Sequence, residues 1–282
     1  MSFASHPRTF ETNRFVYPVV SRRARGVSIG VNLNPDKVCN FDCIYCQVNR
    51  VETSSTRFVE MPELLGELDL AITLATTDEL FTHEKFALVP RELRRLNDIA
   101  FSGDGEPTTY RNFDEIIAAC AELKRRHSLA DVKMVLITNA SMFHRPAVER
   151  GLEILDANQG EIWAKLDAGT AEYYRLVERT TIPFQQILDN ITAAARVRPL
   201  VIQALFMRIH SQGPSPPEID ALCDRLNEIV AAGGAISLVQ VYTVARPPAE
   251  SFVSALPAGD VDAIAARVRE RTGLPAESFY GS

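Results

Sequence analysis

Residues 27–46 read VSIGVNLNPDKVCNFDCIYC, in which an apolar run leads directly into three closely spaced cysteines. The run, Val27 to Leu33, is rich in aliphatic and β-branched residues, which fits a strand buried on both faces of a parallel sheet. Similar runs recur along the chain, at residues 98–102, 133–138, 161–166, 200–207 and 235–242. These six runs predict six parallel strands.

The segments between the runs have the period of amphipathic helices. In residues 112–127 one helical stripe is apolar: Phe113, Ile116, Ile117, Cys120 and Leu123. A second helix is predicted to begin at Ser215, where an N-cap serine is followed by proline and, three residues after the cap, by Glu218. Six alternating strands and helices predict an α/β fold. The periodicity does not decide between an open sheet and a partly closed barrel.

The composition is that of an ordinary globular protein. The chain has 282 residues, of which 46% are hydrophobic and 23% charged, values that exclude disordered and fibrous classes. The net charge of -6 argues against nucleic-acid binding through the overall field, although a local basic groove stays open. No apolar run approaches the roughly 18 residues of a membrane span, and the N-terminus lacks the apolar core of a signal peptide. We expect a cytoplasmic protein with no membrane partner.

The cysteines point to a metal site. Cys39, Cys43 and Cys46 have the spacing C-x3-C-x2-C, and the total of five cysteines is odd, which is typical of a metal site in a reducing compartment. Three thiolates can hold an iron-sulfur cluster with one open iron, or zinc if a histidine completes the tetrahedron. The spacing favours iron-sulfur. Cys120 and Cys223 lie on apolar helical stripes and are predicted to be core residues.

This spacing, with the aromatic Tyr45 directly before the third cysteine, resembles the signature of the radical S-adenosylmethionine (SAM) superfamily. The resemblance implies one 4Fe-4S cluster on Cys39, Cys43 and Cys46, whose free iron chelates SAM. It implies an iron-sulfur enzyme that cleaves SAM reductively and abstracts a hydrogen atom from a substrate, with a flavodoxin or ferredoxin-like electron donor.

The resemblance also implies the fold and its extent. The expected fold is a partial (β/α)6 barrel of the radical SAM type, with a parallel sheet and outer helices. Its core would span residues 26–245. Residues 1–25 would form an N-terminal extension, and residues 246–282 a helical tail packed on the core.

A second motif follows the second predicted strand. Residues 101–108, FSGDGEPT, are similar to the superfamily's glycine-glycine-glutamate motif, although Asp104 stands where the first glycine would be. The likeness implies that Glu106 accepts the SAM amino group, and Gly105 permits a close backbone approach. The alternative is an ordinary Gly/Asp turn that caps a helix.

Polar residues follow the third and fourth strands as well. By resemblance, Asn139, Lys165 and Asp167 are candidates for contacts with the SAM ribose or carboxylate, and Tyr45 is counted among the cofactor-binding residues. These positions follow the carboxyl ends of predicted strands, where parallel sheets place their sites. Each could instead be a helix cap.

Within the superfamily, residues 21–35, 43–50 and 102–108 most resemble the group that contains the tRNA wyosine-base synthases. A tRNA base is therefore one expected substrate class. A protein is the other, including activation of a glycyl-radical enzyme. A non-catalytic zinc or iron-sulfur binding module is the alternative from a different class.

Basic residues near the strand ends are candidates for substrate binding. These candidates are Arg208, His210 and Arg246. They could hold a phosphate or carboxylate group of a substrate, or form ordinary salt bridges. An arginine run could meet an RNA backbone or be a solvated loop; it comprises Arg22, Arg23 and Arg25. The sequence singles out no catalytic residue.

Overall fold

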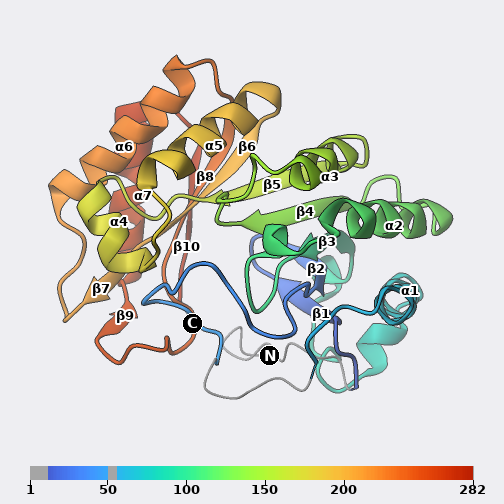
Figure 1. Ribbon diagram of the computed structural model, residues 1–282. Helices are drawn as coiled ribbons and strands as arrows, with labels where there is room; N and C mark the ends of the chain where they lie inside the picture. The colour runs from blue at the N-terminus through green and yellow to red at the C-terminus, as the bar shows by residue number, and fades with distance from the viewer. Residues whose placement is uncertain (1–11, 50–55, 282) are drawn as a thin grey trace. The chain divides into compact units, whose positions relative to one another are not determined.

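The computed structural model describes residues 12–49 and 56–281 (Figure 1). The chain divides into two compact units. The first, here the N-terminal unit, comprises Met1–Cys39, Glu52–Ile137 and Arg145–Glu161. The second, the C-terminal unit, comprises Asn40–Val51, Thr138–His144 and Ile162–Ser282.

The described residues of the N-terminal unit form four strands in the order β1-β2-β3-β4. β1 pairs antiparallel with β2, and the pairs β2/β3 and β3/β4 are parallel. The strands are β1 (Val16–Ser21), β2 (Gly26–Val31), β3 (Leu96–Phe101) and β4 (Lys133–Thr138). The helices are α1 (Met61–Thr76), α2 (Phe113–Arg126) and α3 (Pro146–Asp156), with short 3-10 turns η1 (Glu79–Thr82), η2 (Arg91–Leu93) and η3 (Pro107–Thr109).

In the C-terminal unit, the part that the structure describes forms four parallel strands in the order β5-β6-β8-β10 and a two-stranded antiparallel sheet, β7-β9. The strands are β5 (Gly160–Lys165), β6 (Leu200–Leu205), β7 (Met207–Ile209), β8 (Ile236–Tyr242), β9 (Val253–Ala255) and β10 (Ala276–Phe279). The helices are α4 (Ala171–Glu178), α5 (Phe184–Val197), α6 (Pro216–Ala231) and α7 (Ala258–Thr272). No helix in the described part of the chain is long and apolar enough to cross a membrane.

All six predicted strands are present, as β2, β3, β4, β5, β6 and β8. The predicted class, α/β with a mostly parallel sheet and accompanying helices, is therefore confirmed. The run 200–207 divides into β6 and the start of β7 at Phe206. The division into extension, core and tail stays a prediction, with β1 inside residues 1–25 and α7 and β10 inside residues 246–282.

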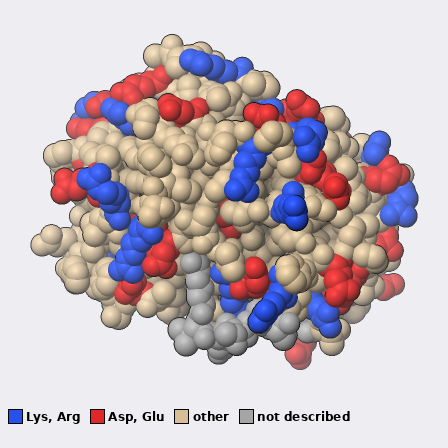
Figure 2. All heavy atoms as spheres, viewed as in Figure 1, with Lys and Arg blue, Asp and Glu red and all other residues tan. Residues whose placement is uncertain are grey.

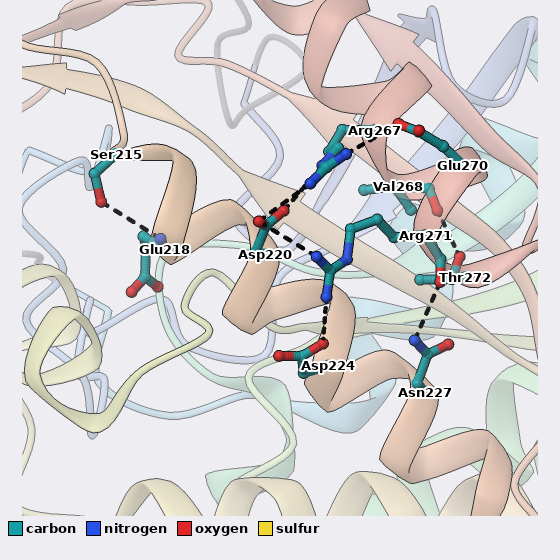
Figure 3. A network of polar contacts seen from close by, with 10 residues as sticks. All are labelled: Ser215, Glu218, Asp220, Asp224, Asn227, Arg267, Val268, Glu270, Arg271 and Thr272. Carbon is teal, nitrogen blue, oxygen red and sulfur yellow. Dashed lines mark hydrogen bonds and ion pairs between the residues drawn. The ribbon is translucent and has the colours of Figure 1, made fainter.

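The helix predicted to begin after Ser215 is α6, and the Glu218 amide donates to the Ser215 hydroxyl at 3.4 Å. The buried Glu218 carboxylate is used elsewhere. It accepts the Gly169 amide at 2.5 Å and the Thr170 hydroxyl at 2.6 Å, so it holds the loop between β5 and α4. Farther along α6, Asp220 and Asp224 meet arginines of α7, including a bidentate contact between Asp220 and Arg267 (Figure 3). The start of α6 is thus tied to two neighbouring segments.

Two cysteines lie in the core, as predicted. Cys120 on α2 and Cys223 on α6 are fully buried. Burial in apolar surroundings raises the pKa of Cys120 to about 12, so this thiol is inert at neutral pH. The remaining three cysteines are half-buried, and none of the five forms a disulfide.

Asp98 on β3 is a buried carboxyl group that accepts a hydrogen bond from Ser28 on β2. Burial raises the pKa of Asp98 from 3.8 to about 6, and the negative charge of Glu161 adds to this rise. The hydrogen bond from Ser28 and the positive charges of Lys133 and Arg23 lower the pKa, but by less. The folded protein therefore binds this proton more tightly than the unfolded chain. The stability that Asp98 contributes is fully present below about pH 4 and is lost as the pH rises to about 6.

We expect Asp98→Asn to stabilise the protein at neutral pH, because the amide oxygen still accepts from Ser28 and no charge is buried. The pKa difference corresponds to an upper limit of about 3 kcal/mol. Urea unfolding of both proteins at about pH 5 and pH 8 checks this, with the larger gain expected at the higher pH. A gain that is the same at both pH values would contradict the assignment.

Candidate functional site

The cysteine-bearing loop is held by its apolar residues. The Ile44 amide donates to the Val177 carbonyl of α4 at 2.9 Å, and Ile44 and Tyr45 pack in a buried cluster with side chains of β6, β7 and α4. The Cys46 amide donates to the Cys43 carbonyl at 2.9 Å, which closes a turn between these two cysteines. Cys43 and Cys46, at the two ends of this turn, are half-buried in the C-terminal unit.

Cys43 has a buried acidic neighbour. Its thiol donates to the carboxylate of Glu178, the last residue of α4, at 2.7 Å. Burial, together with the charge of Glu178, raises the pKa of Cys43 well above its usual range. Cys43 is therefore a neutral thiol in this structure, and a metal bound there must displace its proton.

The donor set fits an iron-sulfur cluster. Three half-buried thiols lie within eight residues of chain, while the two other cysteines are buried. Among the described residues, no three His, Cys, Asp or Glu side chains form a group that could hold a single metal ion. A cluster does not need such convergence, because each thiolate binds a different iron.

Tyr45 belongs to a buried polar group. Its hydroxyl donates to Asp167 and lies 3.2 Å from the Glu178 carboxylate. Burial and the nearby charge of Asp167 raise the pKa of Glu178 to about 8. Two buried carboxyl groups this close disfavour double ionisation of the pair.

Lys165 and Asp167 complete this group. Asp167 accepts the Leu205 amide at 2.6 Å and lies 3.3 Å from the Lys165 ammonium. Lys165 donates to the Tyr242 hydroxyl at 2.7 Å, and its ammonium lies 4.9 Å from the centre of the Tyr45 ring, within cation-π range. The structure therefore brings Tyr45, Lys165 and Asp167 together, and both Asp167 oxygens are engaged within the protein.

Glu178 is a site residue that sequence reasoning missed. It lies 135 positions from Cys43 in the sequence, and no motif includes it. One signal exists: α4 buries Tyr174, Val177 and Glu178, so a carboxylate stands on the apolar face of a short helix. A charged residue at such a position is rarely buried without a partner.

In the N-terminal unit, Glu106 is almost fully buried, with 3% of its surface exposed. Its carboxylate accepts the Thr108 amide at 3.1 Å and the Thr108 hydroxyl, so Glu106 caps η3. The turn considered as the alternative is therefore present, and it orients the side chain that the resemblance assigns to SAM. A side chain in place of Gly105 would lie 2.1 Å from the Val38 carbonyl, so glycine lets this loop pack against the residue that precedes Cys39.

Asn139 organises the turn after β4. Its amide oxygen accepts the Ser141 amide at 3.0 Å, and its nitrogen donates to Asn40 at 2.9 Å. Ala140, between them, has a φ of 60°, a left-handed conformation that costs less for glycine. Asn139 thus lies beside the residue that follows Cys39, and it caps no helix.

The other basic candidates have protein partners. Arg208 lies 3.4 Å from Asp260 on α7, which matches the salt-bridge interpretation. The Arg246 guanidinium donates to the side chain of Gln47, directly after Cys46, at 2.9 Å. The His210 ring stacks on the Phe252 ring, with 4.8 Å between the ring centres. The arginine run lies around the turn between β1 and β2, where burial and the neighbouring Arg23 lower the pKa of Arg22.

Comparisons with known proteins show the family of the chain. A family model described as "Radical SAM superfamily" matches residues 33–211. A GTPase Obg of Brachyspira hyodysenteriae is 28% identical over 189 residues, 66% of this chain and 24% of that protein. A UPF0026 protein of Helicobacter pylori strain J99 is 24% identical over 234 residues, 82% of this chain and 66% of that protein. The chain thus spans less than two thirds of the length of either relative.

A solved structure shares the fold. The crystal structure of Streptococcus suis SuiB bound to S-adenosylmethionine has a TM-score of 0.55 at 14% identity, and the match covers 93% of this chain and 49% of SuiB. At this identity the likeness shows the fold alone. It confirms the expected fold class.

Proposed function

Because the chain belongs to the radical SAM superfamily, we propose that it uses one 4Fe-4S cluster to cleave SAM reductively and to abstract a hydrogen atom from a substrate. The observation that carries this proposal is the cysteine-bearing loop, which presents half-buried thiols while its apolar residues are anchored in the core. The superfamily match covers all three cysteines and Glu106. When bound, the cluster and SAM supply a hydrogen-abstracting radical.

The residues of the chain have distinct proposed roles. Cys39, Cys43 and Cys46 hold the cluster, and Glu106 accepts the amino group of SAM. The capping contacts from Thr108 fix the direction of the Glu106 carboxylate before any ligand arrives. Such preorganisation lowers the cost of ordering the side chain when it binds.

The polar group around Tyr45 supports the cysteine-bearing loop. The Tyr45 hydroxyl, on the cysteine-bearing loop, forms hydrogen bonds with Asp167, after β5, and with Glu178 on α4. Tyr45, Lys165 and Asp167 are proposed to face SAM from this position. Gly105 and Asn139 are proposed to do so from loops beside the residues that flank Cys39.

A tRNA base is the proposed substrate. The support is the resemblance of residues 21–35, 43–50 and 102–108 to the group of tRNA wyosine-base synthases. Figure 2 shows Lys and Arg interleaved with Asp and Glu over the face in view, so RNA would be recognised through local groups rather than through a broad positive field. The second candidate is a protein substrate such as a glycyl-radical enzyme, for which RNA binding is not needed; the net charge of -6 argues against RNA binding through the overall charge.

The proposed chemistry requires a one-electron donor, and a flavodoxin or ferredoxin-like protein fits this need. Reduced thiols on a partly exposed loop suit a reducing compartment, so a cytoplasmic location is part of the proposal.

The test is 5'-deoxyadenosine formation by anaerobically reconstituted protein with SAM and a strong reductant, with and without bulk tRNA. We expect the product in both cases and a faster rate with tRNA. A rate that is indifferent to tRNA would direct the search to protein substrates, and absence of the product would refute the radical chemistry.

A further inference from the structure

Asn32 and Asp104 follow neighbouring strands of the N-terminal unit. Asn32 comes directly after β2, and Asp104 lies in the loop after β3. The two strands are parallel, with Val31 opposite Phe101, and the Ser102 amide continues the pairing to the Val31 carbonyl at 3.1 Å. Both loops therefore leave the same edge of the sheet side by side.

The Asn32 side chain joins the two loops through both ends of its amide. Its nitrogen donates to the Asp104 carboxylate at 2.9 Å, and its oxygen accepts the Asp104 amide at 3.2 Å and the Asn34 amide at 3.0 Å. Both residues are buried, and a side chain in place of Gly103 would lie 2.2 Å from the Asn32 amide oxygen. The contact is thus close and shielded from water.

The contact bears on Glu106, which lies two residues after Asp104. The backbone that follows Glu106 is fixed by η3, and Gly105, which precedes it, packs closely against the Val38 carbonyl. Between Ser102 and Gly105, the contacts of Asn32 hold the chain. Asp104 stands where the superfamily motif has glycine, so this carboxylate is an addition that Asn32 accommodates.

We propose that Asn32 and Asp104 are a positioning pair, which holds the loop so that Glu106 meets the amino group of SAM; this inference rests on the proposed function. The pair acts through geometry, since one amide faces one carboxylate. Either residue can supply the amide, provided that the other supplies the acceptor.

This symmetry gives a sharp test. Asn32→Asp places a second carboxyl group against Asp104. The two carboxylates repel each other unless one takes up a proton, so SAM binding is compared at about pH 9, where protonation is disfavoured. Asp104→Asn keeps an acceptor for the Asn32 nitrogen. The double variant, with both substitutions, exchanges the two groups and again sets an amide against a carboxylate.

The measured quantity is the affinity of the anaerobic, cluster-containing protein for SAM, determined by equilibrium dialysis without reductant, together with iron content and the midpoint of thermal unfolding. We expect Asn32→Asp to weaken SAM binding by at least about tenfold. Asp104→Asn should stay within about twofold of the parent, and the double variant should recover to within about threefold.

Ser28→Ala is the matched control. It removes another buried contact between β2 and β3, the hydrogen bond to Asp98, in the amino-terminal halves of the two strands. The unfolding midpoint should fall while the affinity for SAM stays unchanged. This variant separates lost stability from lost positioning.

Three results would overturn the pair: parental SAM affinity in Asn32→Asp, a loss in Asp104→Asn as large as in Asn32→Asp, or a folded, iron-containing double variant that does not recover. The last two would mean that the charge of Asp104 acts on the ligand directly. Failure of the parent protein to bind SAM is a separate outcome, which refutes the proposed function and the pair's role with it.

Discussion

Replacing Cys43 with alanine is expected to abolish cluster binding and all formation of 5'-deoxyadenosine. Two thiolates cannot replace three in holding a cluster that must leave one iron open. The fold should survive, because Ile44 and Tyr45 still anchor the loop in the apolar cluster. Iron and sulfide analysis, the visible absorption spectrum and product chromatography, all under anaerobic conditions, measure the effect.

Cys120→Ala is the control for this experiment. Cys120 is also a thiol, but it is buried on α2 and far from the motif in the sequence. Its replacement should leave iron content and product formation unchanged, at a modest cost in stability. Turnover by Cys43→Ala, or loss of iron in Cys120→Ala, would refute the assignment of the cluster ligands.

Asp167→Ala is expected to cause the largest loss of stability, about 3–5 kcal/mol, because it removes one partner of a buried ion pair. The Leu205 amide and the Tyr45 hydroxyl lose an acceptor, and Lys165 loses the nearest negative charge. Urea unfolding measures the difference in the free energy of unfolding. Asp167→Asn retains an acceptor for the Leu205 amide and should lose less.

Asp189→Ala supplies the comparison at the surface. Asp189 on α5 is exposed, and its carboxylate accepts a hydrogen bond from Gln185 at 2.9 Å. The expected loss is below about 0.5 kcal/mol. Equal losses for Asp167→Ala and Asp189→Ala would show that the buried group around Tyr45 does not stabilise the fold.

The central strands were predictable because parallel strands that are buried on both faces are continuous apolar runs. β1 escaped prediction because Pro18 interrupts its pattern, and proline is tolerated only at the edge of a sheet, where β1 lies. β7, β9 and β10 are only three or four residues long, too short for a periodic signal. The repeating apolar pattern of the long central strands was visible in the sequence. The pairing of short strands and of the edge strand was not.

The candidate site divides in the same way. The cysteine spacing and the acidic motif are local, so the sequence displays them directly. Glu178 and the pairing of Asn32 with Asp104 depend on side chains brought together over 135 and 72 positions of chain. Glu218 shows the limit most plainly: its position three residues after the Ser215 cap was readable, and the hydrogen bonds of its carboxylate with Gly169 and Thr170 were not.

The contacts of Glu218 have a consequence for local unfolding in the C-terminal unit. Its carboxylate joins the start of α6 to the loop that follows Asp167, and the ion pairs of Figure 3 join the same helix to α7. Segments tied in this manner exchange their amide protons as one cooperative unit rather than separately. We therefore expect local opening at the start of α6 to extend to the loop that carries Asp167, and the ion pairs with α7 to make that opening less frequent.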